Sequence, residues 1–229
     1  MNLVHRRSPF INPRQLAASM VQQLVLLLAV AMLAAGCSKI REQPIPPGSV
    51  VLALGDSLTE GAGVIREEAW PNMLASRTGW IVINGGISGD TSGDALQRLP
   101  ALLDQPTPAL VLVALGGNDM LRHVPQQETV ANLSKIVAVI RAHGAKPVLL
   151  ATPNPSLMGA VFQHLSAADF YQQVADAQRV SLIKNAIAEV LSDPQLKGDP
   201  LHPNAAGHAL LADKIFDELR SFGYIREEH

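Results

Sequence analysis

Short apolar runs that each end at a turn-forming residue constrain the fold of this chain most strongly. Glycine, asparagine or proline follows closely after each of four such runs, which are Val50–Leu54, Trp80–Ile83, Leu110–Leu115 and Pro147–Leu150. Continuous apolar runs of this length are typical of strands that are buried on both faces of a parallel sheet. The sequence therefore predicts a central sheet that is covered on both sides.

Helical periodicity lies between and after these runs. Apolar residues recur at a spacing of three to four residues in Leu96–Leu103, Val130–Ile140, Ile183–Leu191 and Leu211–Leu219. Strands that alternate with helices form right-handed crossovers, which place helices on both faces of a parallel sheet. We expect a three-layer α/β/α, flavodoxin-like domain of the α/β class, with a parallel sheet of roughly five strands.

Composition suits a single globular domain and excludes one class of partner. Of the 229 residues, 48% are hydrophobic and 17% are charged, which is enough apolar material for a sizeable core. The formal net charge is −2, so the chain lacks the strongly basic surface that holds nucleic acid. We expect no nucleic-acid partner.

Residues 1–36 have the pattern of an export signal. Basic residues precede the apolar run Leu24–Ala35, and small residues precede Cys37. A basic region, a short apolar region and a small-residue cleavage site together define a secretory signal peptide. The apolar run is shorter than the roughly 20 residues that a membrane-spanning helix needs, so we expect the signal to be removed.

Cys37 is the single cysteine of the chain and cannot form an internal disulfide. The segment Leu33–Cys37 resembles a bacterial lipobox, which implies that Cys37 is lipidated and becomes the mature N-terminus. Acyl chains there would anchor the protein to a membrane of the bacterial cell envelope, facing the periplasm or in the outer membrane. An ordinary secretory signal and a soluble periplasmic protein are the alternative. The sequence leaves open which membrane carries the anchor.

A proline-rich segment follows the cysteine. Pro44, Pro46 and Pro47 remove backbone donors and favour extended geometry, which is typical of a semi-rigid tether. We therefore expect a lipidated cysteine and tether over residues 37–48 and a folded domain over residues 49–229.

Polar motifs follow the first three apolar runs, at the carboxyl ends of the predicted strands, where parallel sheets collect their functional groups. Ser57 would lie at a helix N-terminus, where free N–H groups stabilise negative charge. Gly89 can bring its N–H close to a substrate, and Asn118 offers a neutral side-chain donor. The simpler alternatives are a helix cap at Ser57, a tight loop with Asp90 or Thr91 as cap, and a turn at Asn118.

A carboxylate and an imidazole precede the last helix. Asp199 and His202 are three residues apart, so one turn can bring them together, with the carboxylate holding the imidazole tautomer. The alternative is an exposed loop in which Asn204 caps the helix. Asp119 is expected to cap or brace its own loop.

Four further histidines lack a comparable carboxylate partner, and we expect most of them at the surface: His123, His143, His164 and His208. His164 is the one rival base among them. No histidines lie at ligand spacing with the single cysteine, so we expect no metal site.

The four motifs occur together, and in order they resemble those of the GDSL, or SGNH, hydrolase family over nearly the whole domain. The resemblance implies Ser57 as nucleophile, His202 as base and Asp199 as its partner. It also implies an oxyanion hole formed by the Ser57 and Gly89 amides and the Asn118 side chain. No metal or organic cofactor is implied.

Trp70–Pro71 and Ile87–Thr91 resemble the bacterial thioesterase, arylesterase and lysophospholipase subgroup. This implies a serine esterase that hydrolyses small-molecule or lipid esters or thioesters through an acyl-enzyme. Two alternatives stay open: a carbohydrate or peptidoglycan O-acetylesterase that uses the same residues, and a non-catalytic lipoprotein that retains the fold for binding.

In that subgroup the segment Thr152–His164 would border the acyl pocket. Its apolar side chains could line a groove, or could pack on the core as a helix: Leu157, Met158, Val161 and Phe162. The sequence leaves open the acyl chain length, the leaving group and the oligomeric state.

Overall fold

The computed structural model describes residues 42–104, 106–154 and 165–226. The expected export signal, Cys37 and the tether before Glu42 lie outside these residues, as do His164 and the four apolar residues expected near the acyl pocket. Over the described part of the chain, none of the helices has the length and apolar character that crossing a membrane requires.

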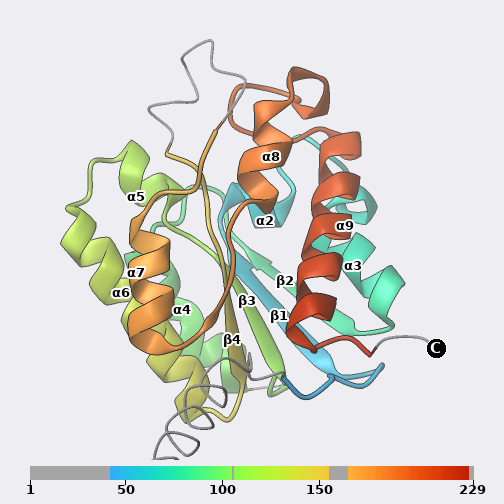
Figure 1. Ribbon diagram of the computed structural model, residues 1–229, viewed down its shortest axis with the longest axis vertical. Coiled ribbons are helices and arrows are strands. Elements are labelled where there is room, and N and C mark those ends of the chain that lie inside the picture. Colours follow the sequence, from blue (N-terminus) through green and yellow to red (C-terminus); the bar gives the residue numbers. More distant parts are fainter. Residues whose placement is uncertain (1–41, 105, 155–164, 227–229) are drawn as a thin grey trace, which may run out of the picture. The chain divides into compact units, whose positions relative to one another are not determined.

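A parallel sheet forms the centre of the described domain (Figure 1). Its five strands are β1 (Val50–Gly55), β2 (Ile81–Gly86), β3 (Leu110–Ala114), β4 (Lys146–Leu150) and β5 (Ser181–Ile183). The strand order is β2-β1-β3-β4-β5, and every pair is parallel. Because strands are added on both sides of β1, the carboxyl ends of β1 and β3 border a crevice where such sheets bind ligands.

Helices cover both faces of this sheet, which confirms the predicted three-layer α/β/α fold (Figure 1). One face is covered by α3 (Trp70–Thr78), α8 (Ala186–Ser192) and α9 (Ala205–Phe222). The other is covered by α4 (Ser92–Asp104), α6 (Gln126–Ala142) and α7 (Phe170–Gln178). Shorter elements complete the order: α2 (Ser57–Glu60), η1 (Arg66–Glu68), α5 (Gly117–Leu121) and η3 (Pro194–Leu196).

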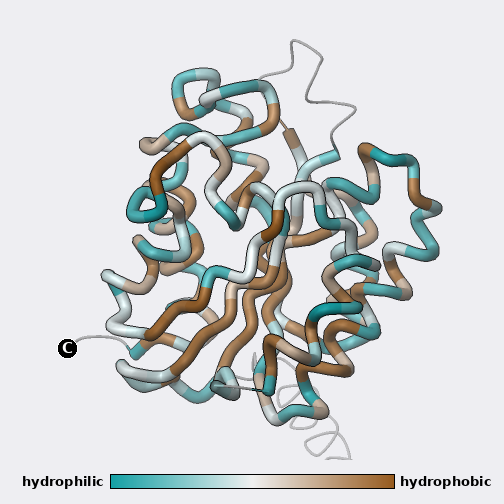
Figure 2. Tube along the Cα trace, turned by 180° about the vertical axis from the view of Figure 1, so that it is seen from behind, coloured by the Kyte–Doolittle hydropathy of each residue, from teal (hydrophilic) through white to brown (hydrophobic). Residues whose placement is uncertain are grey.

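Alternate side chains of the central strands supply the two halves of the core. In β1, Val51 and Ala53 pack toward α3, α8 and α9, whereas Leu52 and Leu54 pack toward the opposite layer. All four are fully buried. Figure 2 shows the result, a hydrophobic centre of strands between helices that are polar on their outer sides. Burial on both faces explains why the central strands β1, β3 and β4 read as unbroken apolar runs.

Two segments differ from the sequence-based expectation. Ile183 was expected in a helix with Ile187, but it ends β5, and α8 begins only at Ala186. The three-residue strand is too short to leave a periodicity of its own, and its isoleucine falls one helical turn before the next. The helix α7 was not predicted.

The folded part also begins before Ser49. The Glu42 N–H donates to the Phe222 carbonyl at 2.8 Å, and the Ile45 N–H donates to the Tyr224 carbonyl at 2.8 Å. Ile45 is buried and accepts a hydrogen bond from the Trp80 indole. The segment from Glu42 to Ile45 is therefore bonded to the rest of the described domain, and the prolines within residues 44–47 are exposed.

Candidate functional site

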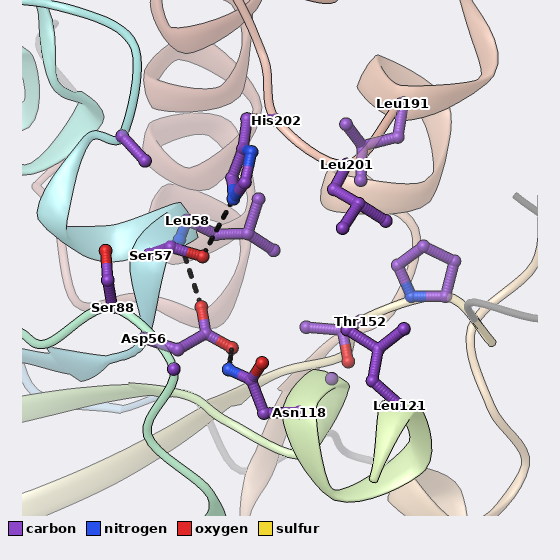
Figure 3. Close-up of a pocket in the computed structure, with 14 residues that line it drawn as sticks. Asp56, Ser57, Leu58, Ser88, Asn118, Leu121, Thr152, Leu191, Leu201 and His202 are labelled. Carbon is purple, nitrogen blue, oxygen red and sulfur yellow. Dashed lines mark hydrogen bonds between the residues drawn. The ribbon is translucent and has the colours of Figure 1, made fainter. Parts of the chain in front are cut away.

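A cavity of about 270 Å³ opens at the carboxyl ends of β1, β3 and β4 (Figure 3). Polar residues from the four sequence motifs line one part of it, and Leu58, Leu121, Leu191 and Leu201 line another. In Figure 3 the Ser57 and His202 side chains point toward each other, with Leu121, Leu191 and Leu201 across the cavity and Leu58 beside Ser57. The crevice expected from the strand order is therefore a cavity with one polar and one apolar wall.

Ser57 is the first residue of α2, and the N-cap of that helix is Asp56. The Asp56 Oδ1 accepts the Leu58 N–H at 3.0 Å, so the alternative in which Ser57 itself caps the helix is wrong. Gly55 makes the turn possible, since a Cβ there would lie 2.0 Å from the Thr59 hydroxyl. The turn leaves the Ser57 hydroxyl free to face the cavity.

Ser57, His202 and Asp199 form a hydrogen-bonded chain. The Ser57 Oγ lies 2.9 Å from the His202 Nε2, and the His202 Nδ1 lies 2.8 Å from the Asp199 Oδ2. The Asp199 Oδ1 also accepts the N–H groups of Leu201 and His202, so one turn joins the carboxylate to the imidazole. Because Nδ1 donates to the carboxylate, a neutral ring presents its unprotonated Nε2 to the hydroxyl.

Asp199 stays ionised in this arrangement. Partial burial alone would raise the pKa of Asp199, but hydrogen bonds from the His202 ring and from the Leu201 and His202 amides outweigh it. The pKa of Asp199 is therefore held below its ordinary value. An ionised carboxylate beside the ring stabilises the imidazolium that forms when His202 takes a proton.

Three donors expected at an oxyanion hole line the same cavity. The N–H groups of Ser57 and Gly89 have no protein acceptor within the described residues. Asn118 donates from Nδ2 to the Asp90 carbonyl at 3.0 Å and to the Asp56 Oδ2 at 3.2 Å, which fixes the plane of its amide. N–H groups that line one cavity can stabilise negative charge that develops there, and Asn118 can join them by releasing one of its two bonds.

Asp56 was not singled out from the sequence as a site residue, yet it joins two of the motifs. Burial raises the pKa of Asp56 to about 6, against a lowering by the Leu58 N–H and by the charge of His202. Its side chain lies between the turn that carries Ser57 and the side chain of Asn118 (Figure 3). The signal in the sequence that could have identified it is an acid directly before the serine, at the end of an apolar run.

Asp119 braces its loop, as expected. It is buried, accepts the Ser92 N–H at 2.8 Å and the Ser92 hydroxyl, and accepts the Thr129 hydroxyl at 3.2 Å. Asp119 therefore ties α5 to the start of α4 and to α6, and this fixes the position of the neighbouring Asn118.

The helix α4, which follows the loop after β2, is capped by Thr91 and not by Asp90. The Thr91 Oγ1 accepts the Asp94 N–H, and the Asp94 carboxylate accepts the Thr91 N–H, which is a reciprocal capping box. Asp90 pairs instead with Arg98 at 2.7 Å. Before α9 the expected cap is present, because the Asn204 side chain accepts the Gly207 N–H at 2.9 Å.

The remaining histidines are not at this site. His123 and His143 are exposed, as expected, whereas the expectation of a surface position is wrong for His208, which is fully buried in α9. It packs where α9 meets the start of α3 and accepts the Trp70 N–H. In the described residues, no group of three or more His, Cys, Asp or Glu side chains could hold a metal ion.

Several known proteins are similar to this chain in sequence and in structure. Residues 53–210 match the family described as GDSL-like Lipase/Acylhydrolase. The chain is 38% identical over 175 residues to an arylesterase of Vibrio mimicus, covering 74% of this chain and 87% of that protein. It is also 38% identical over 175 residues to thioesterase 1/protease 1/lysophospholipase L1 of Escherichia coli strain K12, covering 74% and 83%. The crystal structure of TesA is 31% identical over 76% of this chain and 99% of that chain, with a TM-score of 0.68.

Proposed function

The chain belongs to the GDSL-like lipase/acylhydrolase family of ester hydrolases, and from that premise we propose that it cleaves carboxylic esters or thioesters with Ser57 as nucleophile. The observation that carries the proposal is the 2.9 Å separation of the Ser57 Oγ and the His202 Nε2, with Asp199 bound to the far side of the ring. A hydroxyl, a base and an orienting carboxylate in sequence are what an activated serine requires.

In the first half of the reaction, the Ser57 oxygen attacks the ester carbonyl while His202 takes the hydroxyl proton. The ring becomes an imidazolium, which Asp199 stabilises. His202 then gives the proton to the departing alcohol or thiol, and an acyl-serine remains. In the second half, water attacks the acyl-serine with His202 again as base, and the acid and free Ser57 are released.

The tetrahedral intermediate carries a negative oxygen, which the Ser57 N–H, the Gly89 N–H and the Asn118 amide would stabilise. This assignment is supported by the two unpaired N–H groups and the oriented amide that line the cavity. Loss of one such donor costs on the order of 3 kcal/mol of transition-state stabilisation. Neutral donors suit the role because they leave no charge to compensate before the reaction.

The apolar wall of the cavity favours an acyl chain or aryl group over a sugar-linked acetyl group. Leu121, Leu191 and Leu201 present hydrocarbon surface opposite the polar residues. An arylesterase-, thioesterase- or lysophospholipase-like activity is also what the names of the relatives suggest. We therefore place the O-acetylesterase alternative second, and rates on acetyl and longer acyl esters separate the two.

Anchoring through a lipid on Cys37 is proposed as well, on the lipobox-like sequence Leu33–Cys37. In cells that express the full chain, wild-type protein should incorporate a labelled fatty acid and fractionate with membranes. Cys37→Ser should lose the label and leave the membrane fraction. Persistence of the label in that variant would refute the proposed site.

Ser57→Ala tests the activity. We expect hydrolysis of a chromogenic ester to fall by at least about 10³-fold, with an unchanged unfolding transition. Labelling of the wild-type serine by a fluorophosphonate should be lost in the same variant. Ser76→Ala is the matched control, because it removes an exposed hydroxyl that bonds only within α3. Full activity of Ser57→Ala would refute the nucleophile and, with it, the proposed mechanism.

A further inference from the structure

Charged side chains that the mechanism above does not use hold the loop of Gly89 on both sides. The Arg122 Nη2 donates to the Gly89 carbonyl at 2.6 Å. On the preceding residue, the Glu60 carboxylate accepts the Ser88 N–H at 2.8 Å and the Ser88 hydroxyl. The peptide group before the proposed oxyanion donor is thus bonded to an anion, and the peptide group after it is bonded to a cation.

Gly89 needs such support more than an ordinary residue does. Its φ is +85°, in a region that residues with a Cβ rarely adopt, and glycine rotates freely about both backbone dihedrals. The Gly89 N–H and C=O belong to successive peptide planes, so the direction of the N–H depends on those dihedrals. A strong bond to the C=O therefore restricts where the N–H points.

Arg122 is itself held for this contact. It follows α5, which the buried Asp119 anchors, and the next residue, His123, has a φ of +55° that turns the chain sharply. The Arg122 Nη1 lies 3.8 Å from the Asp94 carboxylate, which Thr91 holds through its N–H and hydroxyl. The guanidinium also covers the glycine, since a Cβ on residue 89 would lie 3.2 Å from Nη2.

We propose that Arg122 is a positioning residue for ester hydrolysis, which aims the Gly89 N–H at the oxyanion by holding the Gly89 carbonyl. The inference rests on the proposed function. Oxyanion donors work because they are oriented before charge develops, and a guanidinium–carbonyl bond is of the strong, charge-assisted kind. Arg122 does not line the cavity, so it acts through Gly89 and not on the substrate.

The test compares Arg122→Ala with Arg141→Ala. Arg141 is a matched control, because this exposed arginine donates to the Gln178 and Arg179 carbonyls at 2.7 and 3.0 Å and lies outside the cavity lining. For Arg122→Ala we expect kcat on a short chromogenic ester to fall about 10- to 100-fold with little change in KM. The reason is that the Gly89 N–H remains but is no longer held in one direction. For Arg141→Ala we expect wild-type kcat and KM.

Two rescue measurements separate positioning from general stability. Millimolar guanidinium should restore part of kcat in Arg122→Ala and leave kcat of wild type unchanged. Arg122→Lys should keep intermediate activity, because its ammonium can still donate to the Gly89 carbonyl but lacks the fixed planar geometry of the guanidinium. The Arg122 side chain is 56% exposed, so its removal leaves no buried charge and the variant should fold.

A wild-type kcat in Arg122→Ala, a rise in KM alone, or an equal loss in Arg141→Ala would overturn the inference. Ser57→Ala in the same assay keeps the two proposals apart. An inactive Ser57→Ala beside a fully active Arg122→Ala refutes the positioning role only, whereas an active Ser57→Ala refutes the proposed function.

Discussion

His202 and His208 lie in consecutive parts of the chain, yet their surroundings are opposite. His202, in the loop before α9, has a side chain that is 22% exposed, with Asp199 on one ring nitrogen and the Ser57 hydroxyl on the other. His208, inside α9, is fully buried. Its Nδ1 accepts the Trp70 N–H over a long 3.4 Å, and its Nε2 has no partner within the described residues.

The difference shows what a histidine needs in order to act as a base. Burial, followed by the nearby charge of His202, lowers the pKa of His208 to about 4, so its ring stays neutral near neutral pH. Within the described residues, no carboxylate is paired with this ring. At His202 a carboxylate compensates the charge, and a hydroxyl lies at hydrogen-bond distance. Burial without a paired carboxylate therefore keeps the His208 ring neutral, whereas His202 has both partners that the proposed proton transfer requires.

The largest expected effect separates the two histidines by activity. His202→Gln should lower kcat by on the order of 10⁴-fold, because glutamine fills part of the space but cannot take the serine proton. His208→Gln should keep kcat within about threefold, because its side-chain oxygen can still accept the Trp70 N–H. Steady-state rates on one ester, with circular dichroism for folding, check both. A folded but inactive His208→Gln would show that His208 is also required for activity.

The second effect is the acid stability of the domain. The pKa of His208 is about 4 in the folded state and 6.5 in an ordinary setting, so on acidification the unfolded chain binds this proton first. The stability that His208 contributes is therefore complete above pH 6.5 and is lost as the pH falls toward 4. The loss amounts to about 3 kcal/mol.

Urea unfolding at several pH values between 7 and 4 measures this dependence. In His208→Gln the acid-induced loss should be smaller by about that amount, because glutamine does not titrate. The same slope in wild type and variant would show that His208 is charged in the folded state or is hydrated there.

Much of the fold was predictable because local patterns carry it. The strands β1, β3 and β4 are buried on both faces and therefore read as apolar runs, whereas β2 at the sheet edge is apolar in sequence but partly exposed. The strand β5 has three residues and α7 has only nine, so neither left a comparable signal. The start of the domain was placed too late because proline indicated a tether, while the burial of Ile45 depends on the distant Trp80.

The site was predictable only where residues follow strands or lie close in sequence. Ser57, Gly89 and Asn118 follow three strand ends, and Asp199 lies one turn from His202. The structure brings all five to one cavity or its hydrogen-bonded chain. Contacts between segments that are far apart in the sequence leave no comparable pattern of motifs or spacing.

Three residues make contacts that the sequence did not predict: Asp56, Arg122 and His208. The Asp56 carboxylate meets an amide 62 residues away, and the His208 ring meets a backbone N–H 138 residues away. Arg122 reaches a carbonyl 33 residues away. Spacing along a chain does not report such contacts, since tertiary packing alone determines them.

The buried acid Asp56 has a pKa that is raised, whereas the pKa of the buried His208 is lowered. Substitution of Asp56 gives the smallest expected effect. The Asp56 pKa of about 6 in the folded state lies above the ordinary 3.8, so the folded protein binds this proton more tightly. The contribution of Asp56 is present below pH 3.8 and is lost as the pH rises through 6. At neutral pH the buried charge therefore costs about 3 kcal/mol.

Asp56→Asn removes that charge but also a hydrogen bond. An amide cannot accept from both the Leu58 N–H and the Asn118 side chain, which costs about 1–3 kcal/mol. The variant should therefore be more stable than wild type by about 1 kcal/mol at pH 7 and less stable at pH 4. Urea unfolding at the two pH values checks the change of sign. A variant that is less stable at both would mean that Asp56 is ionised without cost, so that its charge, unlike that of His208, is compensated within the site.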